Sequence, residues 1–201
     1  MPETKVHFST RETELMCNAE FILTKNKVLE KVKVLLEHLQ SDMQTSLSSR
    51  FRKTDKQLGT PKISRGESYL GLPYLILDFP RVFGQENILA IRTMFWWGNF
   101  FSITLHLAGS FKTALTPKLE PCEGSLAARG YHLGINKDPW VHHFGEANFR
   151  PIDMFEEGQL VRESTALPHL KIAKKIPLSE WARVREMLLV EWEFLIGCCY
   201  D

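Results

Sequence analysis

The chain has 201 residues, of which 44% are hydrophobic and 24% are charged, and its formal net charge is +1. This composition is typical of an ordinary globular protein, and the length suits one sizeable domain spanning residues 1–201. Because the net charge is close to zero, the composition argues against a dedicated nucleic-acid-binding protein with a strongly basic surface, and we do not expect nucleic acid as a partner.

The cysteines and the apolar segments indicate the compartment. The four cysteines show no spacing typical of metal ligands, and a structural disulfide between adjacent residues is geometrically unfavourable; they are Cys17, Cys122, Cys198 and Cys199. We therefore expect reduced thiols. The first residues carry charges where a secretory signal needs an apolar run, and no stretch approaches the roughly 20 apolar residues of a membrane span. We expect a cytoplasmic protein.

Two helices are predicted at the start of the chain. Ser9 and Glu12 form a capping-box pattern that predicts the beginning of the first helix. A second helix is predicted from about Asn26 to Ser46, because its apolar residues recur at helical spacing; they are Val28, Val32, Leu35, Leu36 and Leu39. We expect residues 1–47 to form a helical hairpin that lies on an apolar surface.

A basic connector is expected at residues 48–68. Its six cations are opposed only by Asp55 and Glu67, and glycine and proline interrupt any long helix; the cations are Arg50, Arg52, Lys53, Lys56, Lys62 and Arg65. Such a segment is commonly a solvated linker. The alternative is a patch that binds phosphate or an acidic partner.

Strands are expected through residues 69–178, where we place the sheet. Residues 72–80 form an apolar run between prolines, and a hairpin is predicted around a two-residue turn at Gly98-Asn99. Pairing Trp97 with Phe100 would place Phe95, Trp97, Phe100 and His106 on one mixed face and leave the other face almost purely hydrocarbon. The mixed face resembles the lining of a ligand pocket.

The remaining elements lie on either side of a final strand. Residues 109–130 are expected as a long loop, short strands are expected at 131–135 and 139–144, and 151–165 is a polar excursion. A strand is expected to end at Pro177.

The last predicted element is a helix over residues 179–197, capped by Ser179 and stopped by Gly197. Its apolar stripe is broad enough to cover a sheet face; it consists of Trp181, Val184, Leu188, Trp192 and Leu195. Helices at both ends with strands between them predict an α+β fold. We expect an antiparallel sheet of four to seven strands, packed by an N-terminal helical hairpin and a long C-terminal helix.

Charged residues within apolar strands form the first candidate site. Asp78 could pair with Arg92 if the strand at 72–80 neighbours the hairpin, because a buried charge is costly without a partner. Arg81 would then be free to bind an anion. The alternative is an internal ion pair that fixes the strand register.

His142, His143 and Glu146 are weak candidates for metal ligands. Adjacent residues on a strand point to opposite faces, so only one of the histidines would reach a given site. We therefore expect neither a metal nor another cofactor.

Three functions are compatible with these patterns. The first is a non-enzymatic module that holds a small apolar or anionic amphipathic molecule between an aromatic sheet face and a helix; its expected ligand-binding residues are Asp78, Arg81, Arg92, Phe95, Trp97, Phe100 and His106. The second is an interaction or homodimerisation domain, because large apolar patches are seldom left uncovered. The third is an enzyme with His106 or His132 as general base near Asp78 or Glu146. No sequence motif of a common enzyme class is present, which favours the first.

Overall fold

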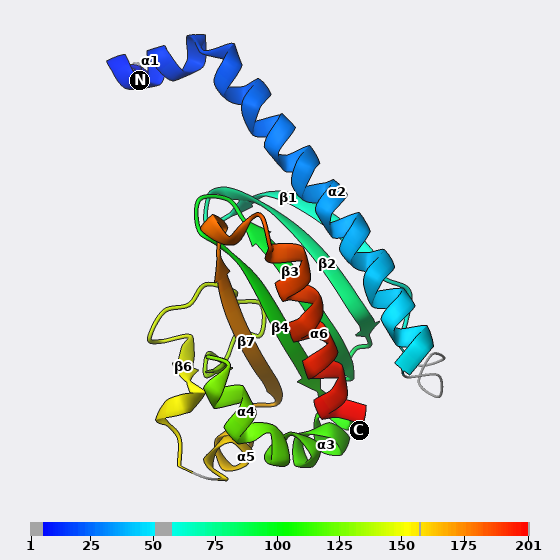
Figure 1. Ribbon diagram of the computed structural model, residues 1–201. Helices are drawn as coiled ribbons and strands as arrows, with labels where there is room; N and C mark the ends of the chain where they lie inside the picture. The colour runs from blue at the N-terminus through cyan, green and yellow to red at the C-terminus, as the bar shows by residue number, and fades with distance from the viewer. Residues whose placement is uncertain (1–5, 51–57, 157, 201) are drawn as a thin grey trace.

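The fold is an α+β arrangement built on a seven-stranded antiparallel sheet, as predicted (Figure 1). The computed structural model describes residues 6–50, 58–156 and 158–200. The strand order is β1-β2-β3-β4-β7-β5-β6, so a meander of four strands is followed by strands from the second half of the chain. The strands are β1 (Lys62–Tyr69), β2 (Leu72–Phe83), β3 (Ile88–Trp96), β4 (Phe100–Ala108), β5 (His132–Gly134), β6 (Phe149–Pro151) and β7 (His169–Pro177).

The helices cover one face and one end of the sheet. Helix α6 lies across the face, α2 runs beside it, and α3, α4 and α5 gather at one end (Figure 1). The α-helices are α1 (Thr10–Cys17), α2 (Ala19–Arg50), α3 (Gly109–Leu119), α4 (Glu123–Ala128), α5 (Gln159–Ser164) and α6 (Val184–Tyr200). Three short 3-10 turns connect them to their neighbours: η2 (Glu120–Cys122), η3 (Ile152–Met154) and η4 (Leu178–Glu180).

The core lies between the sheet and helices α2 and α6. Leu36 of α2, Leu188 of α6 and Leu105 of β4 are fully buried. Trp192 of α6 stacks on Phe79 of β2 with their ring centroids 5.7 Å apart. Burial of these side chains stabilises the fold by about 1.5–3 kcal/mol each, so the two helices are held mainly by their apolar stripes.

The two N-terminal helices do not fold back as the expected hairpin. Helix α2 begins at Ala19, earlier than predicted, and extends to Arg50. The chain bends at Asn18, whose side-chain oxygen accepts a hydrogen bond from the Phe21 amide at 3.1 Å. As a result, α1 and the first turns of α2 form an arm that projects beyond the sheet (Figure 1).

The expected basic connector is partly a strand. Residues 62–69 form β1, which pairs with β2 so that Lys62 lies opposite Asp78. Charged and small residues at an edge strand remain accessible to water, which explains why this strand resembles a linker in sequence. Arg52, Lys53, Asp55 and Lys56 of the same prediction lie outside the described residues.

Three further predictions of local structure are wrong. Residues 109–130 form helices α3 and α4 joined by the turn Glu120–Cys122, rather than a loop. Residues 139–144 are irregular and form no strand. Gly197 does not stop the last helix, which begins at Val184 and continues to Tyr200.

The aromatic hairpin is present, but its register differs by one residue from the prediction. Trp96, not Trp97, pairs with Phe100, and Phe95 pairs with Phe101. The turn contains three residues because the Trp97 amide donates to the Pro73 carbonyl at 3.0 Å instead of joining the β3–β4 ladder. A shift of one residue exchanges the two faces of a strand, so Phe95 lies on the core face of the sheet.

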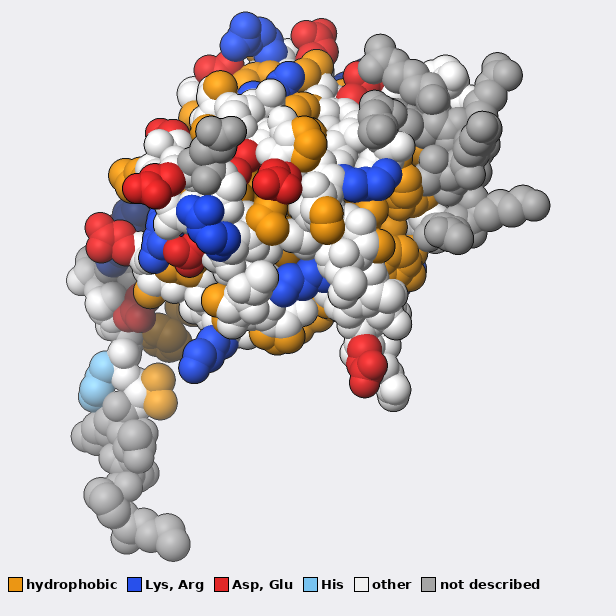
Figure 2. Space-filling model, turned by 90° about the horizontal axis from the view of Figure 1, so that it is seen from below, with side chains coloured by type: hydrophobic (Ala, Val, Ile, Leu, Met, Phe, Trp, Pro, Cys, Tyr) orange, Lys and Arg blue, Asp and Glu red, His pale blue; other side chains and the backbone are white. Residues whose placement is uncertain are grey.

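The surface of the α3–α5 end carries both signs of charge. Seen from below, basic and acidic side chains alternate there with apolar ones, and neither sign forms a continuous patch (Figure 2). None of the helices in the described part of the chain is long and apolar enough to cross a membrane.

Candidate functional site

The charged residues predicted to bind a ligand lie on the sheet face away from α2 and α6. Asp78 accepts two hydrogen bonds from Arg92, at 2.8 Å from Nε and 2.9 Å from Nη2. The Arg92 Nη1 atom lies 3.1 Å from Nε2 of His142. The predicted pairing is thus confirmed, and both carboxylate oxygens of Asp78 are occupied by the guanidinium.

His106 lies on the same face beneath Trp140, with ring centroids 5.6 Å apart. Its Nε2 atom is buried and has no hydrogen-bond partner among the described residues. Burial, followed by the nearby Lys171 ammonium, lowers the pKa of His106 to about 3. The imidazole is therefore neutral at physiological pH and is a weak base.

Lys171 closes this cluster from β7. Its Nζ atom donates to the backbone carbonyls of Pro139 and Val141, and thereby holds the irregular segment over the sheet. Burial, followed by the charge of Arg92, lowers the pKa of Lys171 to about 7. The cluster is a packed network in which side chains and backbone groups bind one another.

The other expected ligand-binding residues lie elsewhere. Phe95 is in the core against Phe101, and Trp97 lies in the turn. Phe100 contacts Trp96 and Phe144 on the outer face. Arg81 lies in β2 opposite Ala90, with its guanidinium 5.9 Å from the Phe83 ring centroid. The residues predicted to bind one ligand therefore do not share one site, because Phe95 lies on the core face of the sheet and the charged residues lie on the outer face.

The histidines predicted as metal ligands or as a general base are close to other protein groups. His142 is bound to Arg92, and the Tyr69 hydroxyl lies 3.0 Å from Nδ1 of His143, while Glu146 is exposed. Within residues 6–50, 58–156 and 158–200, no three His, Cys, Asp or Glu side chains gather closely enough to hold a metal ion. Nδ1 of His132 lies 3.1 Å from the Gly130 carbonyl oxygen.

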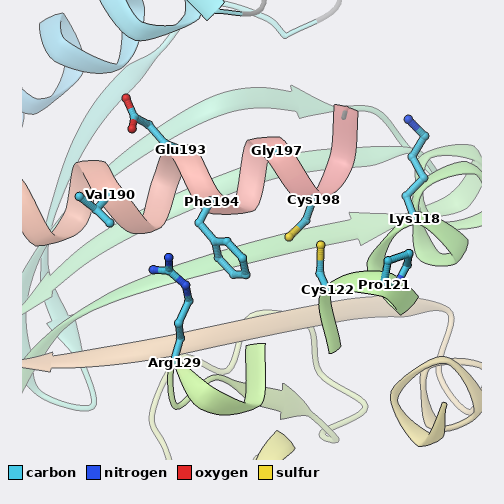
Figure 3. Close-up of a pocket in the computed structure, with 9 residues that line it drawn as sticks. All are labelled: Lys118, Pro121, Cys122, Arg129, Val190, Glu193, Phe194, Gly197 and Cys198. Atoms are coloured by element: carbon cyan, nitrogen blue, oxygen red, sulfur yellow. The ribbon is translucent and has the colours of Figure 1, made fainter. Parts of the chain in front are cut away.

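A pocket of about 700 Å³ lies between α6 and the segment from α3 to Arg129 (Figure 3). Helix α6 supplies one wall, and the end of α3, the turn η2 and the end of α4 supply the other. The lining residues are Lys118, Pro121, Cys122, Arg129, Val190, Glu193, Phe194, Gly197 and Cys198. This volume lies within the range of about 300–1,000 Å³ that is usual for small-molecule sites.

The walls of the pocket are mainly apolar. Phe194 and Val190 project from α6, and Pro121 lies opposite them (Figure 3). Gly197 lacks a side chain and so leaves that part of the helix surface open. The sulfur atoms of Cys122 and Cys198 point toward one another (Figure 3).

The Cys198 thiol contributes apolar surface to the pocket rather than reactivity. Burial raises the pKa of the Cys198 thiol well above its usual range, and its hydrogen bond with Cys122 adds to this effect. Because the thiolate is the nucleophile and the metal ligand, the protonated Cys198 thiol is inert at neutral pH.

A fixed guanidinium borders the apolar wall. Arg129 stacks over Phe194 with its central carbon 4.3 Å from the ring centroid. Its Nη1 atom donates to both oxygens of Glu191 at 3.3 Å. Among the described residues, no acceptor takes a hydrogen bond from Nη2 or Nε of Arg129, so part of the fork is available to a ligand.

The charges around Glu191 do not cancel. Glu191 is buried and also accepts hydrogen bonds from Lys174 at 2.7 Å and from the Tyr131 hydroxyl at 2.9 Å. The single Glu191 carboxylate thus binds two cations, Arg129 and Lys174, and the cluster has a net positive charge.

Lys118 adds a second cation to the lining. Glu193 also borders the pocket, but its carboxylate points away, and Oε1 accepts from Ser46 of α2 at 2.6 Å (Figure 3). The pocket therefore presents an apolar wall with positive charge at its margin.

Sequence reasoning missed this pocket because residues 109–130 were interpreted as a loop. A signal was present: Phe111, Leu115 and Leu119 recur every four residues, which is helical spacing. Pro117 and Pro121 obscured it. Comparison of the chain with protein-family models, curated proteins and solved structures finds no match in any of the three.

Proposed function

We propose that this protein is a non-enzymatic binding module for a small amphipathic anion, held in the pocket between α6 and the α3–Arg129 segment. The observation that carries the proposal is the stacking of Arg129 on Phe194, which places a partly unused guanidinium against an apolar wall. The predicted class of ligand is retained, while its place moves from the aromatic hairpin to this pocket.

The geometry supports a ligand with an apolar body and one carboxylate or phosphate group. The apolar body would lie on Phe194, Val190 and Pro121, where it loses contact with water. The anionic group would bind Nη2 and Nε of Arg129, because a guanidinium fork suits two acceptor oxygens. The Glu191 carboxylate holds the arginine in place and thus lowers the entropy lost on binding.

The experiment compares two probes with the same chain length, dodecanoate and dodecan-1-ol, by isothermal titration calorimetry. We expect dodecanoate to bind more tightly, because only its head group can pair with Arg129. Arg129→Met keeps an unbranched stem, and it should weaken dodecanoate binding by about 10- to 100-fold while changing dodecanol binding little.

A second variant tests the cavity itself. Gly197→Leu places a side chain in the pocket and should weaken binding of both probes. The matched controls are Arg150→Met, a cation that stacks on Phe155 elsewhere, and Gly124→Leu, whose added Cβ meets open space. Neither control should change affinity. Equal binding of the two probes, or unchanged binding in Gly197→Leu, would contradict the proposal.

The location of the protein, the role of the charged cluster on the outer sheet face and enzymatic activity are separate predictions. The four cysteines are free thiols, which supports our proposal that the protein is cytoplasmic. The ligand role of Asp78, Arg81, Arg92 and His106 stays a prediction, as does an enzymatic activity.

A further inference from the structure

The N-terminal arm exposes apolar side chains to an unusual extent. Every residue from Val6 to Thr24 is exposed, and the large hydrophobic residues among them include Phe8 at 61%, Met16 at 65% and Leu23 at 58% exposure. The other large exposed hydrophobics of the arm are Val6, Leu15, Phe21 and Ile22. A soluble chain seldom leaves so much apolar surface in one place without a partner.

The apolar stripe of α2 continues into the arm. Leu29 and Leu36 are buried against the core, and Ile22 lies seven residues before Leu29, which places it on the same face two turns earlier. Phe21 stands in the same relation to Val28. Lys25 marks the point where the helix leaves the body, because its Nζ lies 3.0 Å from Glu67 of β1. The helix face that packs on the sheet after Lys25 is therefore exposed to solvent in the residues before Lys25.

With the adjoining part of α2 up to Lys33 included, the arm has charges that are divided along its length. Residues 6–20 carry Glu12, Glu14 and Glu20 against one arginine, so this half has a net charge of −2. Residues 21–33 carry four lysines against Glu30, so this half has a net charge of +3. The arm is therefore self-complementary when a second arm runs in the opposite direction.

We propose that the arm pairs with the arm of a second copy of this chain, antiparallel and related by a two-fold axis near Phe21 and Ile22. In this arrangement the apolar stripes of the two arms bury one another. The acidic half of each arm lies beside the basic half of the other, with Glu12 and Glu14 near Lys27 and Lys31 of the second copy. A two-fold axis brings the same patch of both copies together, as a closed dimer requires.

The charge division favours a second copy over a lipid surface. A helix that lies on an anionic membrane carries lysine and arginine along its polar face. The distal half of this arm is acidic and would be repelled there. The inference depends only on residues 6–33 and is independent of the pocket.

Sedimentation velocity of the full chain over a concentration series tests the dimer. We expect the wild type to dimerise and Phe21→Ser/Ile22→Ser to raise the dissociation constant by about 100-fold or more, because each substitution counts twice in a two-fold dimer. Met154→Ser, which alters an even more exposed apolar residue on the body, should dimerise like the wild type. Since residues 6–24 contact little of the body, both variants should unfold at the wild-type temperature.

Charge-swapped variants give the sharper test. Lys27→Glu/Lys31→Glu makes the whole arm acidic, and Glu12→Lys/Glu14→Lys makes it basic; each alone should be monomeric. Mixed in equal amounts, they should form a dimer of one copy of each. A monomeric wild type, wild-type association of either charge variant alone, or binding of the arm to neutral vesicles by a protein that stays monomeric would overturn the proposal.

Discussion

Asp78 and Arg92 show how one buried pair connects two strands. Both side chains are largely buried, and the carboxylate satisfies two guanidinium hydrogens. Burying an ion is costly unless its partner is present, so we expect the pair to contribute to the β2–β3 register more than to stability.

Removing one partner should therefore be strongly destabilising. We expect Asp78→Asn to lower the free energy of unfolding by about 3–5 kcal/mol, because it leaves the Arg92 charge buried without a counter-ion. Urea denaturation measures this change. Arg183→Gln breaks the exposed pair with Glu180 and should change stability by less than about 0.5 kcal/mol. Equal effects of the two variants would show that the Asp78 charge is not buried as described.

The low pKa of His106 should make the protein sensitive to acid. Its pKa is about 3 in the folded protein, mainly through burial, and about 6.5 in an unfolded chain. Between these values the unfolded state binds more protons, so the free energy of unfolding falls as the pH falls from 6.5 to 3. His106→Phe should reduce this slope in denaturation curves measured at pH 4, 5 and 6, by up to about 1.4 kcal/mol per pH unit. An unchanged slope in His106→Phe would contradict the prediction that the low pKa of His106 contributes to the pH dependence of stability.

At the scale of elements, helix α6 contains a glycine that does not end the helix. Gly197 lies within the helix, and its φ angle is not among the positive ones. Alanine there should raise the free energy of unfolding by about 0.5–1 kcal/mol, because glycine loses more backbone entropy in a helix. Thermal unfolding measures the effect. A decrease would indicate the helix end that the sequence pattern predicted.

Elements with a regular pattern were predictable, and those fixed by distant contacts were not. The α2 and α6 stripes, the strand ending at Pro177 and the Asp78–Arg92 pair follow from periodicity and charge. The hairpin register depends on a hydrogen bond from Trp97 to Pro73, which lies on another strand. No local pattern around Gly98 contains that information, so the turn was predicted one residue too short.

At the scale of the whole molecule, the pocket depends on segments far apart in sequence. Arg129 and Phe194 are separated by β5, β6, α5 and β7, and only the completed sheet brings α6 beside α4. From the sequence we expect a ligand with apolar and anionic parts on the hairpin, whereas our proposal places such a ligand in the pocket. The sequence prediction did not include this pocket, because helices α3 and α4, which supply its second wall, were predicted as a loop.

The strand order also has a consequence for synthesis on the ribosome. Strands β1 to β4 are neighbours in sequence and in the sheet, whereas β4 pairs next with β7, which follows only after residues 109–168. The first four strands can therefore join while the chain is still growing, but α6, which covers their apolar face, leaves the exit tunnel only after all seven strands. Until then that side is covered only in part, by α2 and by α3, which packs on β3 and β4. A nascent chain arrested before residue 184 should therefore recruit chaperones that recognise exposed apolar surface.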